Sequence, residues 1–217
     1  MSMKQILFNT EMVRAILDGR KSCTRRIVKH DVKAILNSPY HKEHPEVEDK
    51  QIISKLCMPP YQIGDILYVR ETWCKGLERY IYRADYSDTE KFYQGGKEIE
   101  MKWHPSIHMP KEAARIWLKV TDVRVERLQD ITEDETFEEG LDFTPPCLHL
   151  TGENYCDIDG PCTSKIKYCD MSSGELFGEV LWNPTIKKSD LDRNGWNANP
   201  WVWVIEFERC DKPESEG

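Results

Sequence analysis

The sequence contains no run of about 18 apolar residues, and its start, Met1 to Gln5, has no apolar signal core. The first absence excludes a membrane-spanning helix, and the second removes the usual sign of export, so we expect a cytoplasmic protein. Internal repeats and low-complexity blocks are also absent. What is present is a chain of 217 residues, 39% hydrophobic and 10% aromatic, which is long enough to bury a proper core.

The net charge of the chain is negative, but one segment is basic. The chain has 38 acidic and 30 basic residues, a net charge of −8, which argues against a protein that coats nucleic acid non-specifically. Residues 14 to 33 are an exception, because they carry seven cations and only two acids. A local basic site on an acidic body favours one anionic ligand or a short single strand. The seven cations are Arg14, Arg20, Lys21, Arg25, Arg26, Lys29 and Lys33.

The segment from Gly19 to Arg26, Gly-Arg-Lys-Ser-Cys-Thr-Arg-Arg, concentrates these cations. It follows a short amphipathic pattern whose helix Thr10 can cap and Gly19 can end. Cations placed after such a glycine form a positive turn suited to a phosphate or a polarised carbonyl. The structural alternative is that they complement the C-terminal helix dipole while Thr24 begins a strand.

Hydrophobic periodicity predicts an α+β protein that is mainly β, built on an antiparallel barrel with short flanking helices. A capping box at Thr132 to Glu135 predicts a helix that stops at Gly140. The polar residues 30 to 58 are interpreted as a surface excursion. Strands are expected at 6–8, 66–72, 79–84, 115–128 and 201–207, and another extended segment begins at 27–28. Further helices are expected between the Thr10 cap and Gly19, with an apolar face at Met12, Val13, Ile16 and Leu17, and at 175–182.

One domain is expected to take up residues 1–210. Insertions are placed at about 30–58 and 141–175, and residues 211–217 form a flexible tail. The second insertion is rich in cysteine and poor in apolar residues, so it has little core of its own.

The order of these motifs resembles the ASCH domain, a branch of the PUA-like superfamily. Within it, the chain is similar to phage and prophage proteins with an Arg-Glu-Thr-Trp motif, here Arg70 to Trp73, and a Pro-Ser-Ile-His-Met-Pro motif, here Pro105 to Pro110. The similarity covers about residues 4–140 and 176–209. It implies a small PUA-like β-barrel that binds RNA or a modified nucleobase.

Some small bacterial ASCH proteins are amidohydrolases that remove the acetyl group of N4-acetylcytidine with a lysine, a threonine and a glutamate. Their Gly-Arg-Lys-Thr-x-Thr motif matches residues 19–24, and their glutamate follows a Leu-Thr-Glu segment. The resemblance therefore implies a catalytic set of Lys21, Thr24 and Glu139, with Glu138 as the adjacent rival. This chain is much longer than those enzymes, and its insertions bear on whether the activity carries over.

The implied chemistry is coherent and requires no cofactor. Thr24 attacks the acetyl carbonyl, and Lys21 accepts its proton if burial and nearby cations lower the lysine pKa. Glu139 protonates the leaving amine or aligns a water. Candidates for holding a phosphate or the developing negative charge are Arg20, Arg25 and Arg26.

Strand alternation places Glu71 and Trp73 on one face, where an indole can stack on a base and a carboxylate can accept from a base amine. The alternative is a core tryptophan beside a glutamate paired with an arginine. His108 is a further ligand candidate, against the reading of an ordinary surface histidine. In the last aromatic segment, Trp201 and Trp203 fit a core strand, and Trp196 is the ligand-contact candidate.

Four cysteines crowd the second insertion, namely Cys147, Cys156, Cys162 and Cys169. A structural Zn²⁺ held by thiolates would stabilise such a loop in a reducing cell. The spacing lacks a Cys-x-x-Cys knuckle, so free thiols are the alternative.

Three functions follow from the sequence. The first is recognition of a nucleobase, nucleoside or RNA in a basic cleft, with amidohydrolase activity on an acylated cytidine-type base. The second is a non-catalytic RNA-binding module of phage or prophage origin. The third, an adaptor whose insertions bind a protein partner, rests only on the acidic charge. No membrane partner is expected.

Overall fold

The computed structural model describes residues 2–76, 79–141 and 171–213. The chain divides into two compact units. The first unit comprises Met1–Cys23, Pro60–Val123 and Ile205–Gly217, and the second comprises Thr24–Pro59 and Arg124–Val204. The expectation of one domain with two insertions and a tail stays a prediction.

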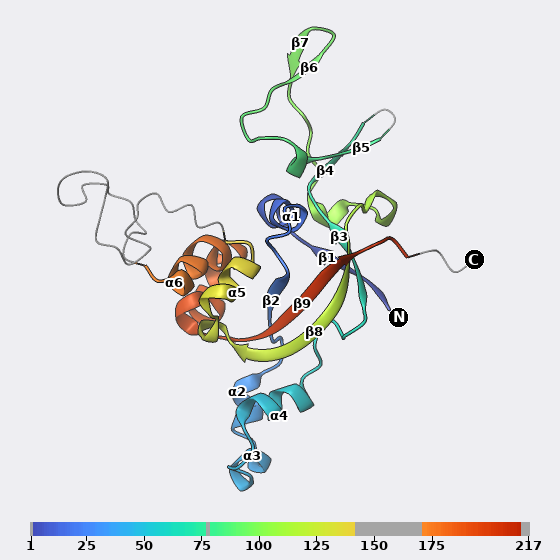
Figure 1. Ribbon diagram of the computed structural model, residues 1–217. Coiled ribbons are helices and arrows are strands. Elements are labelled where there is room, and N and C mark those ends of the chain that lie inside the picture. Colours follow the sequence, from blue (N-terminus) through green and yellow to red (C-terminus); the bar gives the residue numbers. More distant parts are fainter. Residues whose placement is uncertain (1, 77–78, 142–170, 214–217) are drawn as a thin grey trace, which may run out of the picture. The chain divides into compact units, whose positions relative to one another are not determined.

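Five strands are hydrogen-bonded in the order β1-β3-β8-β9-β2 (Figure 1). The protein is thus α+β and mainly sheet, as predicted. The strands are β1 (Met3–Leu7), β2 (Cys23–Ile27), β3 (Ile66–Arg70), β8 (Trp117–Arg127) and β9 (Trp201–Cys210).

The sheet is mixed. β1 pairs with β3 in parallel, Met3 opposite Ile66, and β3 pairs with β8 antiparallel, Leu67 opposite Leu118. A parallel pair needs a long crossover connection, which the residues between β1 and β3 supply. The expectation of a wholly antiparallel sheet was wrong at β1. The described residues form no closed barrel.

The helix α1 (Thr10–Leu17) belongs to the first unit. Its N-cap is Asn9, whose Oδ1 accepts from the backbone N–H of Met12 at 2.8 Å, so Thr10 is the first helical residue rather than the cap. Its buried face includes Val13 and Ile16. Gly19 follows with φ of 77°, a left-handed conformation that glycine adopts without strain.

Two small hairpins complete the first unit (Figure 1). β4 (Trp73–Lys75) pairs with β5 (Tyr80–Tyr82), and β6 (Phe92–Gln94) pairs with β7 (Lys97–Ile99). Gly95 and Gly96 form the two-residue turn between β6 and β7, and both have positive φ. The β6–β7 hairpin was not predicted, because three-residue strands leave little periodicity to detect.

Three short helices in the second unit occupy most of residues 30–58: α2 (Val32–Leu36), α3 (Pro39–Glu43) and α4 (Asp49–Leu56). The interpretation of this whole stretch as a surface excursion was wrong for α4. Ile52 and Ile53 on this helix are 3% and 0% exposed, so α4 contributes to a core.

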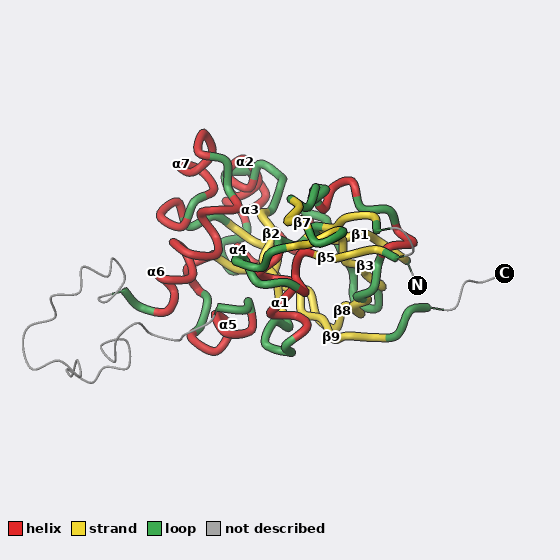
Figure 2. The backbone as a smooth tube through the Cα atoms, turned by 90° about the horizontal axis from the view of Figure 1, so that it is seen from above, coloured by secondary structure: helices red, strands yellow, loops and turns green. Residues whose placement is uncertain are grey.

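The rest of the second unit contains α5 (Glu133–Glu138), α6 (Ser173–Phe177) and α7 (Leu191–Asn194), drawn in red in Figure 2. The capping box at Thr132 is present as predicted. α6 continues into a π-helical turn at Gly178–Trp182. A Cβ at Gly178 would lie 2.4 Å from Cγ of Trp196, so only glycine allows this close approach. The surrounding core includes Leu128, Leu176, Phe177, Trp182, Trp196, Val202 and Val204.

Every helix in the described residues is too short or too polar to cross a lipid bilayer.

The burial of Ile53 allows a direct test of α4. Ile53→Ala should lower the free energy of unfolding by about 2–4 kcal/mol, because it removes buried methyl groups and leaves a cavity. Leu56→Ala in the same helix is the matched control, since Leu56 is 55% exposed and its truncation should change stability by only about 0.5 kcal/mol. Urea unfolding followed by circular dichroism measures both. Equal losses in the two variants would contradict the buried position of α4.

Candidate functional site

A buried arginine surrounded by carboxylates lies in the second unit. The side chain of Arg25 on β2 is fully buried. Its Nη2 donates to Oε2 of Glu135 at 2.9 Å, and its Nη1 donates to Oε1 of Glu139 at 3.3 Å. Oε2 of Glu126 lies 3.9 Å from Nη2. Arg25 was predicted to hold a ligand, but three carboxylates of the protein already surround its charge.

Glu135 connects this cluster to the start of α5. Its Oε2 also accepts from the backbone N–H of Thr132 at 2.9 Å, which completes the capping box, and Arg124 donates to its Oε1. Burial acts to raise the pKa of Glu135, but the Thr132 N–H, Arg25 and Arg124 together lower it below the ordinary value. The carboxylate is therefore stabilised in its ionised form.

Glu139 and Thr24, two of the three expected catalytic residues, both lie in the second unit and are 3% and 1% exposed. Glu139 follows α5 directly, and its backbone N–H donates to the carbonyl of Glu135 at 2.9 Å. Oγ1 of Thr24 accepts from Nη1 of Arg26 at 3.0 Å. A guanidinium donates hydrogen bonds and accepts none, so this contact orients the hydroxyl without removing its proton.

Lys21, the third expected catalytic residue, belongs to the first unit and is 3% exposed. Its Nζ donates to the backbone carbonyl of Cys23 at 2.7 Å and lies 5.6 Å from the ring centroid of Phe8. A carbonyl oxygen and an aromatic face both interact favourably with an ammonium group. These contacts compensate part of the cost of burying a lysine.

Two of the predicted ligand-binding residues, Arg20 and His108, are exposed and lie in the first unit. Arg20 forms an ion pair with Asp18, Nη2 to Oδ2 at 3.1 Å, and its side chain is 37% exposed. His108 ends a single 3₁₀ turn, Ser106–His108, and is exposed. Both side chains are accessible to a ligand from solvent.

Glu71 is bound by an arginine. Nε and Nη2 of Arg115 donate to its two carboxylate oxygens, each at 2.9 Å, and Arg115 also pairs with Asp85 at 2.7 Å. Glu71 is 1% exposed, and this burial raises its pKa although Arg115 acts in the opposite direction. This arrangement corresponds to the structural alternative in which the glutamate pairs with an arginine.

Trp73 is packed among the side chains around it. Its ring lies 5.5 Å from that of Tyr80 and 5.1 Å from that of His104, and it contacts Met109 in a small hydrophobic cluster. Nε1 of Trp73 has no hydrogen-bond partner among the described residues. With 9% of its surface exposed, Trp73 is mainly a packing residue.

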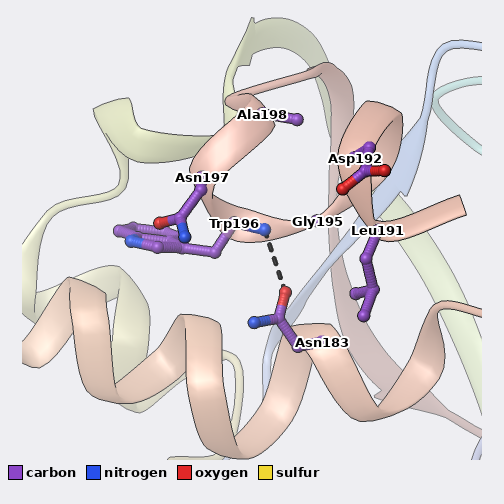
Figure 3. Close-up of a pocket in the computed structure, with 7 residues that line it drawn as sticks. All are labelled: Asn183, Leu191, Asp192, Gly195, Trp196, Asn197 and Ala198. Atoms are coloured by element: carbon purple, nitrogen blue, oxygen red, sulfur yellow. Dashed lines mark hydrogen bonds between the residues drawn. The ribbon is translucent and has the colours of Figure 1, made fainter. Parts of the chain in front are cut away.

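A pocket of about 320 Å³ in the second unit includes Trp196, the ligand-contact candidate (Figure 3). The backbone N–H of Trp196 donates to Oδ1 of Asn183 at 2.9 Å. The indole itself packs in the core with Phe177, their ring centroids 6.2 Å apart. Trp201 and Trp203 are buried, as the core interpretation of their strand predicted. Trp196 therefore combines a core role with a position at the pocket wall.

Cys147, Cys156, Cys162 and Cys169 lie outside the described residues, so the zinc hypothesis stays a prediction. Within residues 2–76, 79–141 and 171–213, no three His, Cys, Asp or Glu side chains are grouped as metal ligands.

Sequence reasoning missed the partners that surround the predicted residues. Glu135 was recognised as a helix cap but not as an ion-pair partner of Arg25, which is 110 positions away. Arg115 lies 44 positions from Glu71.

Comparison of the chain with protein-family models, with curated proteins and with solved structures gives no match.

The lowered pKa of Glu135 predicts a specific pH dependence of stability. An ionised Glu135 stabilises the folded state above its ordinary pKa near 4.5, and this contribution is lost as the pH falls through the lower folded value. Glu135→Gln should therefore be less stable than the wild type at pH 7, and the difference should shrink toward about pH 3. Urea unfolding at several pH values measures it.

Glu133→Gln serves as the control because Glu133 lies in the same helical turn and is exposed. A stability difference between Glu135→Gln and the wild type that stays constant from neutral to acidic pH would contradict the ionised, paired state of Glu135.

Proposed function

We propose that the protein recognises a nucleobase, in a nucleoside or in RNA, on an ASCH-type PUA-like fold, and that it hydrolyses an acylated amine on a cytidine-type base. The motif resemblance supports this proposal. The structural observation that carries it is the burial of all three implied catalytic side chains, Lys21, Thr24 and Glu139, which are 3%, 1% and 3% exposed.

Lysine and glutamate are rarely buried unless they are paired or functional. Lys21 and Glu139 are paired within the protein, and they also match the positions that the motif resemblance implies. In the described part of the chain, the buried polar or charged residues are few, and five of them are candidates from the sequence. Charged side chains on an ordinary protein surface stay exposed to solvent, in contrast to these. The buried set is Lys21, Thr24, Arg25, Asp65, Glu71, Thr136 and Glu139.

The contacts in each unit suggest a role for each group. Thr24 is the nucleophile that takes up the acetyl group, and Arg26 fixes the position of its oxygen at 3.0 Å. A water then hydrolyses the acetyl-threonine ester, which releases acetate and regenerates the hydroxyl. Glu139 transfers a proton to the leaving amine, with Arg25 orienting its carboxylate at 3.3 Å. Lys21 acts as the base only in its neutral form: it accepts the proton of the threonine and becomes an ammonium group, which the Cys23 carbonyl and the Phe8 ring stabilise. Such preorganised groups lower the barrier because they need little rearrangement in the transition state.

One observation favours a second function, a non-catalytic RNA-binding module. The donor to the Thr24 hydroxyl is a guanidinium, which cannot take a proton from the attacking oxygen. A hydroxyl held in this way can serve as a hydrogen-bonding group for a bound base without turnover.

Incubation with N4-acetylcytidine separates the two functions. The enzyme should release cytidine, and Thr24→Val and Glu139→Gln should each reduce kcat/KM by at least about 100-fold, because each removes a reacting group. Chromatographic separation of cytidine from N4-acetylcytidine provides the measurement.

Two matched controls distinguish lost chemistry from lost stability. Thr136→Val alters a second fully buried threonine, whose hydroxyl bonds the Glu133 carbonyl at 2.6 Å. Glu133→Gln alters an exposed carboxylate of the same helix, away from Arg25. Both controls should retain turnover at temperatures where they are folded. No cytidine at high protein concentration, together with saturable binding of a short single-stranded RNA, would favour the binding module instead.

A further inference from the structure

A cavity of about 620 Å³ lies in the first unit, and none of the candidate residues described above lines it. It lies against the β6–β7 hairpin, and its volume is within the range of small-molecule sites. Figure 1 shows the two strands of this hairpin side by side. The residues that line the cavity include Arg83, Asp88, Glu90, Lys91, Phe92, Glu98, Glu100 and Trp103.

Aromatic side chains form one part of the lining. The rings of Phe92 and Trp103 are 5.9 Å apart in an edge-to-face arrangement, and Tyr86 packs on both rings at 5.0 and 6.2 Å. The three rings support one another, so Phe92 and Trp103 are held in place beside the cavity. Arg83 already lies over Trp103, with its Cζ 5.7 Å from the ring centroid, which shows that this aromatic lining accommodates a cation, and the remaining ring surface suits an alkyl chain.

The charged part of the lining has more acids than bases. Both of its cations are paired, Arg83 with Asp88 at 2.9 Å and Lys91 with Glu98 at 3.0 Å. Glu90 and Glu100 form no ion pair with any described residue, although Glu90 accepts from the Ser87 backbone N–H at 3.2 Å. Two carboxylates therefore remain to balance positive charge on a ligand.

We propose that this cavity binds an aliphatic di- or polyamine. Two protonated amines would pair with Glu90 and Glu100, and the alkyl chain between them would lie on Phe92 and Trp103. The excess of carboxylates disfavours a phosphate or another anion. The ring faces in the lining suit an organic cation with an alkyl chain better than a compact metal ion, which prefers several converging oxygens.

Calorimetric titration of the full chain with spermidine at low salt tests this site. Saturable binding is expected, and the double variant Glu90→Gln/Glu100→Gln should raise Kd roughly five- to tenfold, as expected for the loss of two exposed ion pairs. Glu112→Gln is the matched control, because Glu112 is an exposed acid of the same unit outside the cavity. Its Kd should equal that of the wild type.

A second comparison tests the aromatic lining through the ligand rather than the protein. Hexanediamine should bind more tightly than ethylenediamine, since its longer chain covers more apolar surface. Hexanediol should not bind, because it has no charge. The proposal is overturned if spermidine fails to bind at millimolar concentration, or if the double variant and Glu112→Gln bind it equally.

Discussion

The ion pairs of Arg25 connect β2 to the region around α5, and the second unit depends on them. A fully buried guanidinium is costly unless carboxylates surround it, and here Glu135 and Glu139 bond it directly. Glu135 also accepts from the backbone N–H of Thr132, so the same side chain caps the start of α5 and neutralises a buried charge. Loss of one partner would remove part of the compensation for the charges that stay buried, which couples the members of the cluster.

The first unit uses the same principle with different residues. Arg115 holds both oxygens of Glu71, and Tyr82 lies against the guanidinium with its ring centroid 3.9 Å from Cζ. Arg25 in the second unit and Glu71 in the first both come from sequence motifs, and both are buried and ion-paired within the protein. The basic segment of residues 14–33 is therefore less available to an anionic ligand than its charge suggested, because at least Arg25 is matched by acids. This favours a small ligand over a long polyanion.

Local signals in the sequence predicted local structure well. The capping box at Thr132 has all its partners within three residues, and the turn at Gly19 requires only that glycine tolerates positive φ. The alternating apolar residues of 115–128 predicted β8 because side chains alternate between the two faces of any strand. α4 was missed because its polar composition concealed the adjacent pair Ile52 and Ile53.

The amino-acid sequence by itself determined much of the local secondary structure, the mainly β composition of the fold and the set of candidate functional residues. Only the tertiary structure decided that β1 pairs with β3 in parallel and that Glu71 belongs to Arg115. It also decided that Phe92 and Trp103 line one cavity. The physical reason is distance along the chain: helix caps and strand alternation act over a few residues, whereas ion pairs and cavities join residues whose separation no local pattern records.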